Sequence, residues 1–286
     1  MILKICDYKL LCNRGSGDYN EDIIGLTPHG AWVLDGATGL NNKNLVSNES
    51  DANWFVNKWN EYLNENIKND DSLRNIIKNG IDKIKSEYLT LVGDNKLELL
   101  DFPSCAATIL KFHKDKIEYL LLGDCTLFAK SKDDVKIYKD TSLDYFDNLV
   151  YTAMSNIENK ENITLNEKKE ILMPTIISNR LKKNKNDGYW VLEFSKDAAE
   201  NCISGFIDIE DKIELMLMSD GFSCAYDKYN IFTKEGMMKV ARDKGIDYIY
   251  NKVRNIEKED EVAIKFPRFK IHDDSSCIYL DIYKSK

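Results

Sequence analysis

Apolar residues along the chain follow two patterns: short runs typical of strands, and longer stripes with helical spacing. The first third contains three runs and then two stripes in which apolar side chains recur every three or four positions. The runs are residues 2–12, 23–26 and 31–34, and the stripes are residues 55–67 and 73–91. Each stripe lies among charged residues, which predicts an amphipathic helix packed by one face on a sheet.

The middle of the chain is a series of apolar runs separated by polar turns, which predicts a meander of antiparallel strands. These runs are residues 105–112, 117–122, 127–130 and 135–138. Residues 143–185 are polar and helical, with a capping-box pattern from Thr164 to Glu167. Pro174 lies inside this segment and is expected to kink or split the helix.

The last third returns to strands and ends on two helices and a strand. Apolar runs predict strands at residues 189–194, 213–218 and 276–283, and helical spacing predicts helices at residues 233–241 and 246–256. Gly245 separates the two helices and is expected to end the first one.

Strands and helices come in blocks and do not alternate strictly, which favours antiparallel sheets covered by helices over a doubly wound parallel sheet. The sequence contains no internal repeat, no Pro- or Ser-rich linker and no low-complexity tract. A chain of 286 residues can form one large domain. We therefore predict an α+β fold in a single domain, residues 1–286.

Charge and composition narrow the class of protein. The 40 Lys and Arg residues against 48 Asp and Glu residues give a formal net charge of −8. An acidic balance argues against nucleic acid as the partner, since phosphate-backbone binding needs a basic surface. No run of about 18 apolar residues is available to span a membrane, and the N-terminus lacks a signal-peptide pattern. The seven scattered cysteines lack disulfide or zinc spacing, which predicts reduced thiols in a cytoplasmic protein.

Acidic residues gather at the ends of apolar runs, beside small residues. The segments are Asn20-Glu21-Asp22, Leu34-Asp35-Gly36, Leu122-Gly123-Asp124, Ser219-Asp220-Gly221 and His272-Asp273-Asp274. One Asp-Gly pair alone predicts a turn. A carboxylate at the end of a buried strand is costly unless something pairs with it. Because Lys and Arg are rare near these five segments, the joint pattern indicates a site for hard divalent cations.

Six ordered motifs carry a resemblance to a known family. They are Asn20-Glu21-Asp22, Asp35-Gly36-Ala37-Thr38-Gly39, Ser104-Cys105-Ala106-Ala107-Thr108, Gly123-Asp124-Cys125, Ser219-Asp220-Gly221-Phe222 and Asp273-Asp274-Ser275-Ser276. In order and spacing the chain resembles the metal-dependent protein phosphatase 2C (PPM) family, in particular its bacterial single-domain members. The resemblance implies a four-layer α-β-β-α sandwich of two antiparallel sheets flanked by helices, with a helical flap insertion at about residues 142–188.

The resemblance also implies a two-metal site holding Mn²⁺ or Mg²⁺, with a third, weaker metal in bacterial relatives. Asp35 would bridge both metals and Gly36 would offer its carbonyl. Asp220 and Asp273 would hold the first metal, and Asp124 would join Asp220 at the third. At the second metal, the family pattern implies that Glu21 is a direct ligand and that Asp22 acts mostly through water.

The implied activity is that of a serine/threonine protein phosphatase in bacterial signalling. Two cations about 3.5–4 Å apart lower the pKa of a shared water and aim it at phosphorus, so that no phosphoenzyme is needed. The implied catalytic residues are Glu21, Asp35, Asp220 and Asp273. The implied partners are proteins phosphorylated on Ser or Thr, made by an opposing protein kinase, and neither a nucleic acid nor a membrane.

Two departures from the family pattern leave an alternative open. Many members carry a phosphate-binding Arg four residues before the position of Glu21, where this chain has Gly17; Arg14 is the candidate replacement. Eukaryotic members have a His where this chain has Ala37. The alternative is therefore a catalytically weak or inactive regulatory module on the same fold; a structural Ca²⁺-binding sandwich is a third reading.

Two further groups near these motifs are interpreted without a catalytic role. The basic segment at residues 180–185 is expected to be a solvated helix end, with a role in a flap as the other reading. His272 adjoins Asp273 and is expected to be structural.

Overall fold

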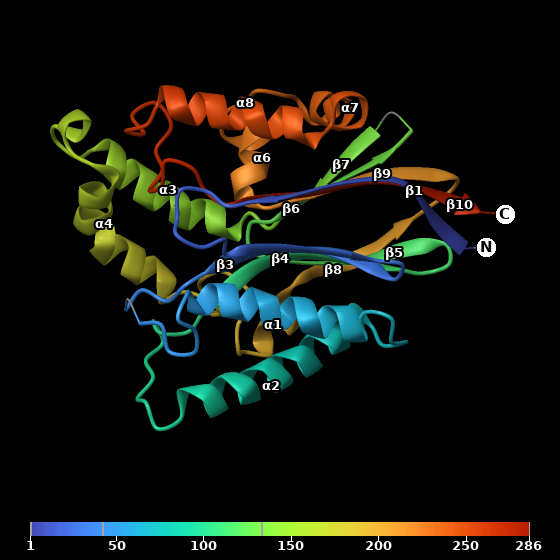
Figure 1. The fold of residues 1–286 in the computed structure, drawn as a ribbon, viewed down its shortest axis with the longest axis horizontal. Coiled ribbons are helices and arrows are strands. Elements are labelled where there is room, and N and C mark those ends of the chain that lie inside the picture. Colours follow the sequence, from blue (N-terminus) through green and yellow to red (C-terminus); the bar gives the residue numbers. More distant parts are fainter. Residues whose placement is uncertain (1, 42, 133, 286) are drawn as a thin grey trace.

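Two five-stranded antiparallel sheets face each other in the computed structural model, which describes residues 2–41, 43–132 and 134–285 (Figure 1). Sheet A has the strand order β1-β10-β9-β6-β7, and sheet B the order β2-β3-β4-β5-β8. Sheet A consists of β1 (Ile2–Asn13), β6 (Thr126–Ser131), β7 (Asp134–Tyr138), β9 (Lys212–Met218) and β10 (Ser275–Ser285). Sheet B consists of β2 (Asp22–Thr27), β3 (Gly30–Ala37), β4 (Ser104–Phe112), β5 (Lys116–Leu122) and β8 (Ile203–Asp208).

Helices cover the outer face of each sheet (Figure 1). Sheet B is covered by α1 (Asp51–Asn66) and α2 (Leu73–Val92), and sheet A by α6 (Asp220–Asp227), α7 (Lys234–Lys244) and α8 (Ile246–Glu259). The short α5 (Asp197–Asn201) packs against α2. The order of the layers is therefore α-β-β-α, which confirms the predicted fold class.

The amphipathic pattern explains how α1 docks on sheet B. The Ser50 side chain caps the helix by accepting a hydrogen bond from the backbone N–H of Asn53. Phe55 and Trp59, both fully buried, then pack in the same cluster as Trp32 of β3. Burying a large apolar side chain contributes about 1.5–3 kcal/mol, so this stripe fixes the face that α1 presents to the sheet.

The space between the sheets is filled by the opposite faces of the same strands. Val33 of β3 packs there with Leu215 of β9 and Ile278 of β10, whereas Trp32 faces the helices. Successive side chains of a strand point to opposite faces. Asp35, two residues after Val33, therefore points between the two sheets.

The segment predicted to be a flap contains a pair of helices at one end of the sandwich (Figure 1), and we keep the name flap for these residues, 142–188. It contains α3 (Ser142–Ser155), the 3₁₀ turn η1 (Lys160–Asn162) and α4 (Leu165–Arg180). Lys168 of α4 is fully buried and donates to the carbonyl of Val262, 2.6 Å away, which ties the flap to the loop before β10.

The sequence features of α4 are confirmed with one exception. Thr164 and Glu167 form the expected capping box. Pro174 was expected to kink or split the helix, and the split is wrong, because α4 continues through that residue. Pro174 and Glu170, whose carbonyl loses its helical partner, are both exposed, so water can take the missing hydrogen bond.

Two strand predictions are corrected by the structure. The meander breaks after β5, because β6 joins the other sheet and pairs with β7 and β9. Gly123, with φ +72°, makes the turn at which the chain changes sheets. Residues 189–194 form only isolated bridges, such as that between Leu192 and Cys105. Their apolar side chains fill core positions, since Leu192 and Phe194 pack in the cluster under α1 and α2.

Edge strand β8 and helix α6 lie outside the sequence prediction. β8 contains Gly205 and exposes Ile203 and Phe206, so its pattern is weak.

The seven cysteines are free thiols, of which only Cys6 and Cys12 are not buried. No helix in the described ranges is long and apolar enough to cross a membrane.

Candidate functional site

Two carboxylates are brought together by the pairing of β2 with β3. Asp22 and Asp35 are direct partners in the antiparallel register, and side chains of opposed residues project to the same face. Asp22 is only 5% exposed. Its Oδ2 is buried and has no hydrogen-bond partner among the described residues. A buried, unpartnered carboxylate oxygen is costly, so this position calls for a cation or a proton.

Three more carboxylates come from connections at the same end of the sheets. Asp124 lies in the turn after β5, Asp220 begins α6, and Asp273 lies in the loop before β10. Each of the three interacts electrostatically with Asp35. These carboxylates therefore meet in one place, although Asp22 and Asp273 lie 251 residues apart in sequence. We call the set the acidic cluster; its members are Asp22, Asp35, Asp124, Asp220 and Asp273.

The loops that carry Asp220 and Asp273 are held to each other by backbone contacts. The Ser219 N–H donates to the Ser276 carbonyl at 3.0 Å, and the Ser275 hydroxyl donates to the Gly221 carbonyl at 3.0 Å. A Cβ atom on Gly221 would lie 1.9 Å from the carbonyl oxygen of Asp274. Glycine after Asp220 is therefore required for this close approach, in addition to any role in a turn.

Burial and mutual repulsion make the cluster hard to ionise. Burial raises the pKa of Asp22 to about 8. Burial, then repulsion from Asp22 and Asp220, raises the pKa of Asp35 well above its usual range. Asp220 keeps access to solvent, yet the surrounding protein, and then Asp273 and Asp124, raise its pKa to about 7. A group of carboxylates whose pKa values are raised by burial and by one another is typical of metal and catalytic sites.

The flap adds two groups that the sequence analysis missed. Burial, then repulsion from Asp220, raises the pKa of Asp147 on α3 to about 6. Burial and Asp147 in turn raise the pKa of Asp124 to about 6. Burial, then Asp147 and Asp220, raises the pKa of Tyr151. Helix α3 thus borders the acidic cluster, and no sequence motif marks either residue.

Glu21 is oriented by hydroxyl groups and by the neighbouring strand. Its Oε1 accepts hydrogen bonds from Thr38, at 2.7 Å, and from Ser50. The Gly36 N–H donates to the Glu21 carbonyl at 3.0 Å. These contacts leave Oε2 of Glu21 available for another partner.

Asp274 is a structural residue that the sequence analysis left without a role. Its Oδ1 accepts the Gly15 N–H at 2.7 Å, and its Oδ2 accepts the Glu21 N–H at 2.8 Å. Asp274 therefore ties the turn after β1 to the loop before β10. The sequence signal was present as the second Asp of the Asp273-Asp274 pair.

Cations lie around the acidic cluster and not inside it. Lys139 bridges Asp227, at 3.1 Å, and Asp144, at 3.5 Å. Arg14, the candidate phosphate ligand, donates from Nη1 to the Asp18 carbonyl at 2.6 Å, within its own loop. The structure places Arg14 in that exposed loop and shows no contact between its described side chain and the cluster.

The basic segment after α4 differs from the solvated helix end that was expected. Arg180 donates to the carbonyl of Thr38 at 3.3 Å, next to the end of β3. The Lys183 side chain is 6% exposed and lies 3.6 Å from Glu193, and burial lowers its pKa to about 8. The segment therefore fastens the flap to the body of the protein.

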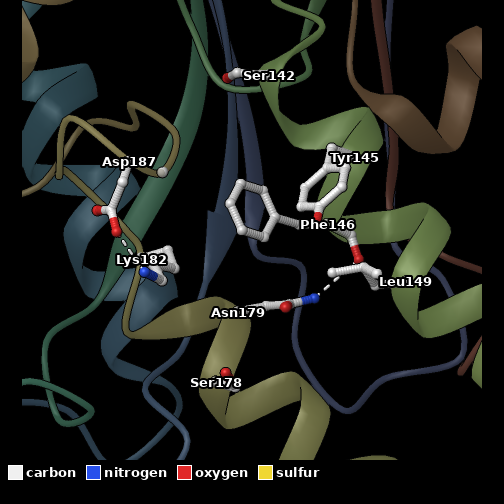
Figure 2. A pocket seen from close by; sticks show the side chains of 9 residues that line it. Ser142, Tyr145, Phe146, Leu149, Ser178, Asn179, Lys182 and Asp187 are labelled. Atoms are coloured by element: carbon white, nitrogen blue, oxygen red, sulfur yellow. Dashed lines mark hydrogen bonds and ion pairs between the residues drawn. The ribbon is translucent and has the colours of Figure 1, made fainter.

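A pocket of roughly 480 Å³ opens between α3 and α4 (Figure 2). Tyr145, Phe146 and Leu149 form one side, and Asn179 and Lys182 the other. Asn179 donates to the Phe146 carbonyl at 2.8 Å across the base of the two helices. None of the residues that line the pocket belongs to the acidic cluster, so the two sites are separate.

His272 is structural, as expected. Its Nδ1 lies 2.8 Å from Oε2 of Glu257, which also accepts from Arg254 at 2.6 Å. Arg254 donates further to the carbonyl of Asp273 at 2.5 Å. This buried network supports the backbone of the loop that carries Asp273.

The acidic cluster is not preassembled as a chelating group. Within residues 2–41, 43–132 and 134–285, no three His, Cys, Asp or Glu side chains are arranged so that they could hold a metal ion as they stand. The chemistry of the donors nevertheless fits a hard divalent cation. They are carboxylate oxygens, and the buried Oδ2 of Asp22 has no hydrogen-bond donor among the described residues.

Comparison with known proteins supports the fold. No protein-family model matches the sequence, and no curated protein does. The serine/threonine phosphatase PstP/Ppp of Mycobacterium tuberculosis is 12% identical, with a TM-score of 0.58 over 98% of this chain and 99% of that one. The catalytic domain of PstP in complex with two manganese ions is 14% identical, with a TM-score of 0.55 over 99% of each chain. PppA of Pseudomonas aeruginosa, a key regulatory component of T6SS, is 11% identical, with a TM-score of 0.56 over 98% of this chain and 97% of that one.

Proposed function

We propose that this chain, which has the fold of the bacterial PPM serine/threonine phosphatases, is a metal-dependent phosphatase of phosphoserine and phosphothreonine proteins. Residues 1–286 would form one catalytic domain, with residues 142–188 as its flap. The observation that carries the proposal is the convergence of Asp22, Asp35, Asp124, Asp220 and Asp273 at one end of the two sheets. The seven free thiols support a reducing compartment such as the cytoplasm.

The metal ligands proposed are those of the motifs. Asp35 would serve both of two Mn²⁺ or Mg²⁺ ions, and Gly36 would offer its carbonyl. Asp220 and Asp273 would hold the first ion, and Glu21 the second, with Asp22 acting mostly through water. Asp124 would join Asp220 at a third, weaker ion. Because the side chains are not in chelating positions as they stand, loading would draw them together. When bound, such cations would neutralise the cluster and lower the pKa of a water that they share.

The chain itself would contribute orientation. Thr38 and Ser50 hold one oxygen of Glu21, so its other oxygen can be aimed at a cation. Asp274 and Arg254 fix the backbone of the loop that presents Asp273. Such supporting contacts keep ligands in place and limit the rearrangement needed during the reaction.

The test is turnover by purified protein that has been stripped with EDTA and reloaded with Mn²⁺. We expect hydrolysis of p-nitrophenyl phosphate and of a phosphothreonine peptide only after reloading, and its loss in Asp35→Asn. Asp82→Asn, an exposed carboxylate paired with Lys196, is the matched control and should retain activity. Equal activity with and without Mn²⁺, or no activity after reloading, would refute the proposal.

The second candidate is a regulatory module without turnover. It is favoured by Ala37 at the position where eukaryotic members have a His, and by the lack of a ready chelating group in the described residues. Calorimetric Mn²⁺ binding to a protein that hydrolyses neither substrate would select this candidate.

A further inference from the structure

Lys270 is a cation in direct contact with the acidic cluster. Its Nζ lies 2.7 Å from Oδ1 of Asp273. Burial favours the neutral amine, yet Asp273, Asp274 and Glu21 together raise the pKa of Lys270 above its usual range. The Lys270 side chain is 44% exposed, although protein surrounds it on most sides, so a ligand from solvent can reach it.

The backbone around Lys270 is fixed against the turn that carries Glu21. The Ser16 N–H donates to the His272 carbonyl at 2.8 Å. Asp274 accepts hydrogen bonds from the N–H groups of Gly15 and Glu21. Lys270, two residues before His272, therefore stands at the rim of the cluster, where the turn after β1 meets the loop before β10.

The other cations near the cluster are already engaged. Lys139 is shared by two carboxylates, and Lys228 lies 4.9 Å from the centre of the Tyr151 ring. Arg14 is bonded to a carbonyl of its own loop, and Arg180 to the carbonyl of Thr38.

The partner of Lys270 is the Asp273 carboxylate, which a bound cation could also engage. Both hydrogen bonds found at the Asp273 side chain use Oδ1, one from Lys270 and one from the Asp274 N–H at 3.0 Å. If a divalent cation were bound to Asp273, the carboxylate would attract the ammonium less, and the charge of the cation would repel it. An exposed ammonium released in this way is a suitable ligand for an anionic oxygen.

We propose that Lys270 binds a phosphoryl oxygen of the phosphate monoester dianion that enters the acidic cluster. The assignment rests on the proposed phosphatase function and names the residue that would attract and hold the substrate's phosphate. A cation at the entrance would add to the positive charge of the metal ions that neutralise the cluster, and so would help to attract a dianion past its carboxylates.

The experiment compares Lys270→Met, Lys270→Arg and the control Lys258→Met, an exposed lysine on α8, with the wild-type protein. Three quantities are measured: Ki for inorganic phosphate, kcat and KM for p-nitrophenyl phosphate at saturating Mn²⁺, and the Kd of Mn²⁺ by calorimetry without phosphate. A charge-assisted hydrogen bond changes affinity about 10- to 100-fold. We expect Lys270→Met to raise the phosphate Ki and lower kcat/KM by that factor, with Mn²⁺ bound as tightly as before or more tightly. Lys270→Arg should recover most of the loss, and Lys258→Met should match the wild type.

The outcomes separate this assignment from the proposed function. A wild-type protein without Mn²⁺-dependent turnover overturns the function itself. An active wild type whose phosphate Ki stays within about twofold in Lys270→Met overturns only the role of Lys270. A rise in Ki that merely follows weaker Mn²⁺ binding also overturns it, because Lys270 would then act by positioning Asp273.

Discussion

Replacing Asp22 by Asn should stabilise the metal-free protein at alkaline pH. Asp22 is 5% exposed, and its Oδ2 has no hydrogen-bond partner in the described structure. Asn keeps the shape of the side chain and removes its charge. It also removes the repulsion between this position and the carboxylates of Asp274 and Asp273.

The size and sign of the effect follow from the pKa of Asp22. Burial raises it from 3.8 to about 8, and each unit corresponds to about 1.36 kcal/mol. The folded state holds the proton more tightly than the unfolded state, so stability falls as pH rises from about 4 to about 8. The full shift corresponds to about 6 kcal/mol; because the neighbouring acids relax, we expect Asp22→Asn to gain about 2–5 kcal/mol at pH 8.5. The gain should shrink toward zero at pH 4.

The assay is urea unfolding of both proteins in EDTA at pH 4, 6 and 8.5, followed by circular dichroism. Repeating the series with Mn²⁺ should reverse the ranking at pH 8.5, since the wild type binds the cation with one more carboxylate. An Asn variant that is no more stable than the wild type at pH 8.5, or whose gain is the same at every pH, would refute the reasoning.

Three other predictions concern the supports of the site. Arg254→Met leaves Glu257 charged and buried, and should cost about 3–5 kcal/mol in urea unfolding; a loss under about 1 kcal/mol would contradict the buried pair. Gly221→Ala places a Cβ 1.9 Å from the Asp274 carbonyl, so it should lower Tm and weaken Mn²⁺ binding by calorimetry. Gly17→Ala, whose Cβ would lie at an ordinary contact distance of 3.6 Å from the Tyr19 carbonyl oxygen, should do neither, and equal behaviour of the two variants would contradict the close approach. Adding Mn²⁺ at about a hundredfold excess over its Kd should stabilise the protein by about 2.7 kcal/mol, seen as a rise in Tm that EDTA reverses; an unchanged Tm would count against the metal centre.

Much of the fold could be predicted because its signals are local. The apolar stripes of α1 and α2 and the capping box of α4 depend on neighbours within one or two helical turns. The clustering of small and acidic residues at strand ends is likewise readable in order along the chain.

The errors arise where tertiary contacts override a local pattern. Residues 189–194 are apolar because they fill core positions, and not because they pair in a sheet. β6 does not pair with β5, the strand before it in the chain; it joins the other sheet, where it pairs with β9. Lys183 is buried against Glu193, although its basic surroundings predict a solvated helix end.

The sequence by itself identified the carboxylates of the acidic cluster as candidates, because a carboxylate at the end of a buried strand is costly unless something pairs with it. Only the tertiary structure decided which of them meet. The β2–β3 register sets Asp22 opposite Asp35, and the hydrogen bonds of Asp274 set Lys270 beside Glu21. Glu21 and Lys270 lie far apart in the chain, and both proximities depend on sheet pairing and loop contacts that no local pattern records.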